Sequence, residues 1–218
     1  MTDRSSLGVA ALLVAASAAA GVWGYMALPA DATIALQLGL DGRMHQHLPK
    51  AEGLALLPFV AGIVVAGLAW GASRPRYQGA LEAAGRPFSA ILIGVAGLLL
   101  VAQVTLIQVA RQADFQLMPP LAITCGVFLT MVGDSLGKAR HNLFVGLRTR
   151  ATLADPRIWD KAHRLTGRLM FAGGILLTLA GFVLRDPRAL AAAIAVCAAG
   201  PPLIGVARSA VLARNARS

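Results

Sequence analysis

The chain has 218 residues, of which 57% are hydrophobic and only 14% are charged, and its formal net charge is +10. A soluble domain carries about 25% charged residues, and the few charges of this chain lie between long apolar runs. This composition excludes an ordinary soluble globular domain, and it leaves no soluble basic domain for direct nucleic-acid binding. It predicts an all-α integral membrane protein whose main partner is the lipid bilayer.

Six apolar runs are long enough to be transmembrane helices, each of which needs about 20 residues to cross the hydrocarbon core. In chain order the runs are residues 6–28, 54–71, 88–110, 117–136, 169–184 and 189–207. The first run is too long for the core of a cleaved signal peptide, so we expect an uncleaved helix with Trp23 and Tyr25 as interface anchors. Pro201 and Pro202 predict a kink or break inside the sixth run.

The basic residues orient this predicted bundle. Of the 20 lysines and arginines, all but five fall on one side of the membrane. The five on the other side are Arg43, Lys50, Arg111, Arg185 and Arg188. By the positive-inside rule the richer side is cytoplasmic, which predicts a six-transmembrane-helix bundle with both the N-terminus and the C-terminus in the cytoplasm.

We divide the chain into three parts. Residues 1–53 hold the first helix and an outer-loop module, residues 54–110 hold two central helices, and residues 111–218 hold a basic inner loop at 137–168 and the last helices. Small residues also predict close helix contacts, although glycine is common in membrane helices in any case. The candidate pairs are Gly67 with Gly71, Gly94 with Gly97, and Gly173 with Gly174.

The predicted outer loop contains the pair His45 and His47. With Asp41 or Glu52 nearby, such a pair has the residue types that bind zinc or copper. Two histidines in a loop are more often incidental, so we predict no metal site and no cofactor.

The inner loop at 137–168 has two different halves. The second half predicts a helix, because Asp155 is a good N-cap and Pro156 suits the first helical position. This helix can continue into the fifth apolar run. The first half mixes apolar residues with Gly146, Arg148 and Thr149. We interpret it as an irregular segment packed at the inner mouth of the bundle; the alternative is a solvated basic loop lying on headgroups.

Several residues of the inner loop follow one another in a specific order and spacing. The stretch Asn142-Leu-Phe-Val-Gly-Leu-Arg-Thr is followed by Thr152-Leu, by Trp159-Asp-Lys-Ala-His-Arg, and by Gly167 and Gly173-Gly174. This pattern resembles the SdpI family, bacterial membrane proteins named for an immunity protein against a secreted killing peptide. The resemblance covers about residues 131–184. The chain departs from it at Arg150-Ala151, where the family usually has Pro-Trp, and at Ala162, where it usually has Thr.

A second, weaker resemblance concerns the first outer loop. Leu28-Pro29, Gly42 and Lys50 match parts of a shorter module that often precedes the first one in this family, but its inner Pro and His are absent. The match stands in the expected place, between the first two helices.

The resemblance implies a function and a set of important residues. It implies a multi-pass protein of the bacterial cytoplasmic (inner) membrane that senses or neutralises an extracellular toxin peptide or envelope signal, without catalysis, and recruits a cytoplasmic transcriptional repressor. We expect the functional or structural core of the inner loop to be Asn142, Gly146, Arg148, Thr149, Trp159, His163 and Arg164. Arg148 is the best single candidate, because its guanidinium is a fork of donors in an otherwise apolar stretch.

Asp134 is the one acidic residue well inside an apolar run. Charges inside the membrane are costly and often functional. We expect this carboxylate to pair with Arg140, Arg148 or Arg164 and so to hold the loop to the bundle, rather than to carry protons or ions.

Two other classes of function remain as alternatives. A small transporter or channel would normally need more polar residues at mid-membrane than Gln103 and Gln108. A membrane enzyme would need Asp134, His141 and His163 to face one cavity, and the sequence contains no phosphate loop, Gly-x-Ser-x-Gly or His-Glu-x-x-His motif. We therefore predict that the chain is not an enzyme.

Overall fold

The computed structural model describes residues 4–38, 44–112, 115–139, 141–142 and 145–215. In chain order its elements are α1 (Arg4–Ala27), β1 (Thr33–Leu38), β2 (Met44–Pro49), α2 (Lys50–Ala72), α3 (Pro75–Arg111), α4 (Met118–Leu136), α5 (Arg150–Ala154), α6 (Pro156–Val183) and α7 (Pro187–Asn215). Six of the helices are long and apolar enough to cross a membrane. The predicted six-helix membrane bundle is therefore confirmed, with a short β-hairpin that was not predicted.

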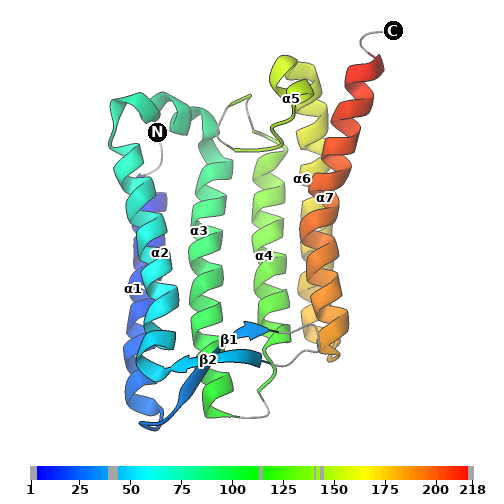
Figure 1. Cartoon of the computed structure of the whole chain (residues 1–218). Coiled ribbons are helices and arrows are strands. Elements are labelled where there is room, and N and C mark those ends of the chain that lie inside the picture. Colours follow the sequence, from blue (N-terminus) through cyan, green and yellow to red (C-terminus); the bar gives the residue numbers. More distant parts are fainter. Residues whose placement is uncertain (1–3, 39–43, 113–114, 140, 143–144, 216–218) are drawn as a thin grey trace.

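The long helices form two groups (Figure 1). The first group is α1, α2 and α3, the second is α4, α6 and α7, and α3 packs against α4 where the groups meet. Both ends of the chain lie at the same end of the bundle, together with α5, while the β-hairpin lies at the opposite end. We call these the inner and the outer end, following the charge bias of the sequence.

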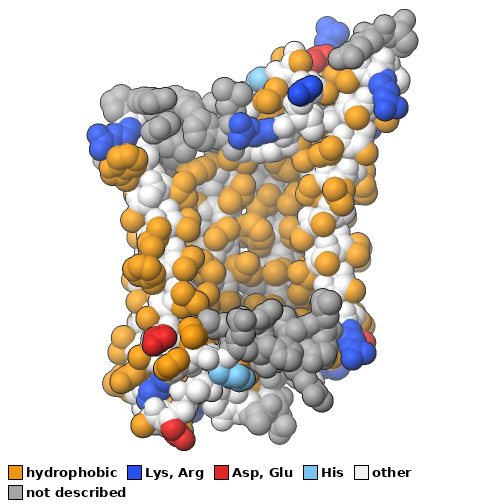
Figure 2. Space-filling model, in the orientation of Figure 1, with side chains coloured by type: hydrophobic (Ala, Val, Ile, Leu, Met, Phe, Trp, Pro, Cys, Tyr) orange, Lys and Arg blue, Asp and Glu red, His pale blue; other side chains and the backbone are white. Residues whose placement is uncertain are grey.

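The surface is typical of a protein in lipid. Figure 2 shows hydrophobic side chains across the middle of the molecule and Lys and Arg side chains towards its two ends. Leu12, Leu176 and Val183, for example, are 71%, 66% and 75% exposed. Such exposure is unfavourable in water and is expected where acyl chains cover the helices.

Cations cover two aromatic rings at the outer end. The Lys50 ammonium lies 4.4 Å from the ring centre of Tyr25, and the Arg111 guanidinium lies 5.0 Å from that of Trp23. These are cation–π distances. The arrangement agrees with the prediction that the two aromatic residues anchor α1 at the interface.

A buried glutamine compensates for a proline in the first group. Pro58 lies inside α2 and has no N–H to donate to the carbonyl of Leu54 one turn earlier. The Nε2 of Gln103, on α3, donates to this carbonyl at 2.9 Å, and the Gln103 side chain is buried. Gly21 of α1 allows the close approach, because a Cβ there would lie 3.1 Å from the same carbonyl oxygen. Gln103 thus forms a hydrogen bond between α3 and α2.

Replacing Gln103 by leucine is expected to lower the free energy of unfolding by about 1–3 kcal/mol, because the Leu54 carbonyl is then buried without a partner. In a Pro58→Ala background the N–H of residue 58 can bond the Leu54 carbonyl. In that background, replacing Gln103 by leucine is therefore expected to lower the free energy of unfolding much less. Titration with a denaturing detergent measures both effects. Gln108→Leu is the control, since this side chain bonds Arg111 within α3. Equal losses in both backgrounds would contradict this pairing.

In the second group α4 and α6 meet at their backbones. A Cβ on Gly174 would lie 2.6 Å from the carbonyl oxygen of Gly126, and one on Gly167 would lie 2.7 Å from that of Gly133. Position numbers rise along α4 as they fall along α6, so the two helices are antiparallel. The glycines on each helix are seven residues apart, which returns them to one face every two turns. We call this contact the glycine seam.

The predicted glycine contacts are only partly correct. Gly174 lies in the glycine seam, and Gly94 packs so closely on Phe128 of α4 that a Cβ there would overlap the ring. A Cβ on Gly67, Gly71 or Gly97 would have no neighbour within 4 Å. The predicted contacts at these three glycines are therefore wrong for the described chain.

The position of the helix break also differs from the prediction. α7 continues through Pro201 and Pro202 without interruption. The non-helical residue lies instead inside α3, at Gly85, where φ is 50° and ψ is −137°. The break occurs at Gly85 because glycine adopts positive φ without steric cost. α7 continues because each proline removes only one backbone hydrogen bond, a loss that a membrane helix tolerates.

The start of α6 agrees with the prediction. Asp155 is its N-cap, with the side chain accepting a hydrogen bond from the Arg157 N–H at 2.7 Å, and Pro156 is the first helical residue. The helix then continues without a break into the fifth apolar run. This rigid helix carries the side chains that hold the inner loop.

Candidate functional site

Two aromatic residues of α6 form the base of the candidate site. Trp159 and His163 are four residues apart, so they share a face of the helix, and both are almost fully buried. Their rings stack with centroids 3.9 Å apart at an angle of 20°. The Trp159 Nε1–H donates to the carbonyl of Ala139, after the end of α4, at 3.0 Å. The pair therefore connects α6 to the segment that leaves α4.

Both ring nitrogens of His163 bond to backbone groups. Its Nδ1 lies 2.9 Å from the Trp159 carbonyl oxygen, and its Nε2 accepts the Leu147 N–H at 2.9 Å. A carbonyl can only accept, so Nδ1 carries the proton and the imidazole is in its neutral form. His163 thus holds the loop at Leu147 in a defined position against α6.

Gly146, the residue before Leu147, is required at its position. Its φ is 125°, a conformation that side chains rarely permit. A Cβ at this position would also overlap Nε2 of His163. Backbone conformation and space therefore both demand glycine here.

Hydrogen bonds between residues three apart in the sequence hold the two ends of the loop. The Asn142 side chain is buried, and its Oδ1 accepts the Val145 N–H at 2.8 Å. Thr149 is the N-cap of α5: its Oγ1 accepts the Thr152 N–H at 3.1 Å, and its N–H donates to the Thr152 Oγ1 at 2.9 Å. The Thr149 hydroxyl also lies 3.1 Å from that of Ser209 on α7.

The loop contacts both helix groups. Leu147 lies against Gly205 of α7, where a Cβ would come too close to the leucine side chain. Val145 packs against the cluster that contains Ala10 of α1 and Phe88 of α3. The described residues of the loop are therefore packed, as predicted, and they connect the first group to the second. We call Asn142, Val145, Gly146, Leu147 and Thr149, together with Trp159 and His163, the inner clamp.

Two of the predicted site residues do not belong to this packing. Arg148 and Arg164 are exposed, and neither guanidinium forms a hydrogen bond or ion pair with a described residue. The remaining five come together: Asn142, Gly146, Thr149, Trp159 and His163. Arg148 is thus free to meet a partner, while Arg164 lines a separate crevice between α4 and α6.

Among the described residues, Asp134 pairs with a residue that the prediction did not name. The carboxylate pairs with Lys138 at 2.7 Å and not with Arg148 or Arg164; Arg140 lies outside the described residues. Lys138 is one turn further along α4, so the pair forms without any rearrangement of the loop. The Asp134 side chain is 59% exposed at the inner end of the helix, so no buried charge results.

The arrangement gives no support to the enzyme alternative. His141 lies 5.0 Å from the Trp159 ring and its Nε2 is 3.2 Å from the Leu153 carbonyl oxygen, so both histidines bond to backbone. Asp134 lines a crevice to which neither histidine contributes. Among the described residues, no Asp, Glu, Lys or Arg is buried.

The outer histidines also show no metal cluster within the described part of the chain. His47 Nδ1 lies 3.5 Å from the Thr33 hydroxyl in the hairpin. The His45 side chain and Asp41 lie outside the described residues. No group of three metal-binding side chains gathers among those that are described.

Sequence reasoning missed Thr152 and Ser209. The spacing Thr149-x-x-Thr152 is that of a capping box, so it was a usable signal. Thr152 also donates to the Leu147 carbonyl at 2.6 Å, which ties α5 to the inner clamp. Nothing in the sequence indicated that Ser209, sixty residues from Thr149, lies beside it.

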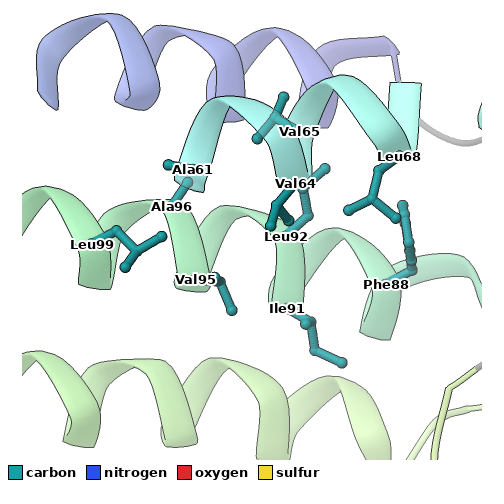
Figure 3. A pocket seen from close by; sticks show the side chains of 10 residues that line it. All are labelled: Ala61, Val64, Val65, Leu68, Phe88, Ile91, Leu92, Val95, Ala96 and Leu99. Atoms are coloured by element: carbon teal, nitrogen blue, oxygen red, sulfur yellow. The ribbon is translucent and has the colours of Figure 1, made fainter. Parts of the chain in front are cut away.

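A further cavity lies between α2 and α3 (Figure 3). Its volume is about 70 Å³, and its lining is apolar, with Val64 and Leu68 from α2 and Phe88 and Leu92 from α3. It offers no hydrogen-bonding side chain for a specific ligand.

Comparison with known proteins bears on the same region. Residues 138–206 match the model of the SdpI/YfhL protein family. The immunity protein SdpI of Bacillus subtilis (strain 168) is 29% identical over 77 residues, which are 35% of this chain and 36% of that protein. The chain thus aligns with about a third of the length of this curated relative. No solved structure matches significantly.

These matches confirm the predicted family resemblance. The matched residues contain the whole inner clamp, α5, α6 and the larger part of α7. They exclude α4, although its glycines form the seam with α6. Together with the six apolar helices, the matches identify a multi-pass protein of the bacterial inner membrane.

Proposed function

Since residues 138–206 match the model of the SdpI/YfhL family, we propose that the chain is a non-catalytic immunity protein that protects its cell against an extracellular peptide. The observation that carries the proposal is the position of the inner clamp. Val145 packs on the first helix group and Leu147 on the second. A change at the outer end of the first group can therefore reach the cytoplasmic surface through this loop.

The outer hairpin is the proposed contact for the peptide. Ile34 of β1 is buried with Leu28, which follows α1, with Leu54 of α2 and with Ile107 of α3. The hairpin therefore rests on α2 and α3. The Lys50 Nζ also donates to the Leu28 carbonyl at 3.1 Å. The described sheet has only two antiparallel strands, so each strand has an outer edge without a strand partner in it. An extended peptide can pair with such an edge through its backbone.

The cytoplasmic surface is the proposed contact for a transcriptional repressor. Arg148 is exposed beside the inner clamp, and its guanidinium can bind a carboxylate with two parallel hydrogen bonds. Next to it lies a cavity of about 510 Å³ between α5, the start of α6 and α7. Apolar residues line it together with Thr149, Ser209 and the charged residues Arg150, Asp155 and Arg214. A shift of the clamp would change both features together.

Survival of a sensitive host tests the proposal. Cells that express the chain are challenged with peptides secreted by the source bacterium, and the inhibitory concentration is compared with that of cells carrying an empty vector. We expect the native chain to raise this concentration by about tenfold or more, which corresponds to a modest difference in binding energy. Failure to protect against any of these peptides would contradict an immunity function.

Arg148→Ala tests the cytoplasmic contact separately. This variant is expected to lose repressor recruitment, measured as membrane localisation of a tagged candidate repressor. Arg157→Ala is the matched control, because Arg157 is equally exposed but lies at the start of α6, outside the inner clamp. An equal effect of the two substitutions would argue against a specific role for Arg148.

A further inference from the structure

A crevice at the inner end of the glycine seam gathers three cations. Its volume is about 380 Å³, and Lys138, Arg164 and Arg168 line it together with Asp134. Gly133 and Gly167 form part of its lining, at the point where the backbones of α4 and α6 touch. The small residues leave a recess between the helices, and the long basic side chains stand around it.

The charges in this crevice do not cancel. Asp134 pairs with Lys138, whereas Arg164 and Arg168 make no ion pair with a described residue. Both arginines are exposed on α6 and one turn apart, so their like charges repel each other. An anion between the two guanidinium groups would remove this repulsion, and a phosphate accepts hydrogen bonds from both.

The surface towards the middle of the membrane is apolar. On α6, Phe171 and Ile175 are each 41% exposed, at the helical spacing that continues the face of Arg168. On α4, Met131 and Val127 are 39% and 47% exposed, on the face that leads to Asp134. The glycine seam therefore has cationic side chains at its inner end. Towards the middle of the membrane, exposed apolar side chains of α4 and α6 flank it.

We propose that this crevice binds one anionic phospholipid of the inner leaflet. Its phosphate lies between Arg164 and Arg168, and an acyl chain lies along the glycine seam against Phe171. Basic recesses between helices at the cytoplasmic face suit such headgroups, and neither a free anion nor a zwitterionic lipid matches both halves of the surface. The site is separate from the inner clamp and does not depend on the proposed immunity function.

Native mass spectrometry of the purified full chain in detergent tests this site. The chain is offered phosphatidylglycerol or phosphatidylcholine at equal concentration. We expect one phosphatidylglycerol to be retained per chain, with a preference of about tenfold over phosphatidylcholine, as expected for a phosphate held by two arginines. The double variant R164Q/R168Q is expected to lose this preference. The double variant R157Q/K161Q removes the same charge from exposed positions near the start of α6 and is expected to keep it.

Three results would overturn the proposal. Equal losses in the two double variants would show a diffuse electrostatic effect rather than a site. Equal retention of the two lipids would show that charge does not select the ligand. Displacement of the lipid by millimolar inorganic phosphate would show a free-anion site.

The apolar half of the site has its own test, which does not rely on the arginine variants. F171A is expected to weaken retention of long-chain phosphatidylglycerol and to leave that of the dihexanoyl form unchanged. Unchanged retention of the long-chain lipid would contradict the placement of the acyl chain.

Discussion

Replacing Gly174 by alanine is expected to push α4 away from α6 and to lower the free energy of unfolding by about 1–3 kcal/mol, the usual cost of overpacking. The added Cβ would lie 2.6 Å from both the Gly126 carbonyl oxygen and the Thr130 nitrogen. Both are backbone atoms, so no side-chain rotation relieves the contact and the helices themselves must separate. Titration with a denaturing detergent, followed by circular dichroism, measures the loss.

Gly67→Ala is the matched control for this substitution. Gly67 also lies within a membrane helix, but a Cβ there has no neighbour within 4 Å. Alanine favours helix more than glycine does, so we expect this variant to be at least as stable as the native chain. If Gly174→Ala kept native stability, the close contact at the glycine seam would be contradicted.

Replacing His163 by leucine is expected to release the inner clamp. The substitution leaves the part-buried Leu147 N–H without its acceptor, which costs about 1–3 kcal/mol, and it removes the stacking on Trp159. Hydrogen exchange measures the effect locally, and we expect the amide of Leu147 to exchange at least about tenfold faster, since each 1.4 kcal/mol corresponds to a factor of ten. Protection in the survival assay is expected to fall with it.

His141→Leu is the control for the histidine substitution. His141 also lies beside the Trp159 ring, but it is exposed and bonds the Leu153 carbonyl instead of the loop backbone at Leu147. We expect exchange at Leu147 to stay unchanged in this variant. Unchanged exchange in His163→Leu would mean that other contacts hold the loop.

The candidate site was predicted in its residue types but not in its geometry. Trp159 and His163 were expected on one helical face, and they stack there. Arg148 was the best single candidate for a functional or structural role. Its side chain lies outside the packing, and backbone groups at Leu147 and Ala139 form the hydrogen bonds to His163 and Trp159. Motif spacing identifies side chains, but it gives no sign of which backbone groups the fold brings to them.

The sequence by itself determined the membrane character, the number of long helices and the start of α6. These properties depend on hydrophobicity over about 20 residues and on caps within one helical turn, so residues that are neighbours in the sequence are enough to predict them. The short hairpin at the outer end was missed, because strands of six residues next to long apolar runs give a weak local pattern.

Only the tertiary structure decided which helix faces meet. Asp134 pairs with Lys138 and not with Arg148 or Arg164, Gln103 bonds the carbonyl freed by Pro58, and the close helix contact lies at Gly174 and not at Gly67. In lipid an apolar face is equally satisfied by acyl chains and by another helix, so hydrophobicity does not reveal the partner. The partner of a helix face is revealed by close contacts at small residues and by buried hydrogen bonds. The two residues that make such a contact lie far apart along the chain.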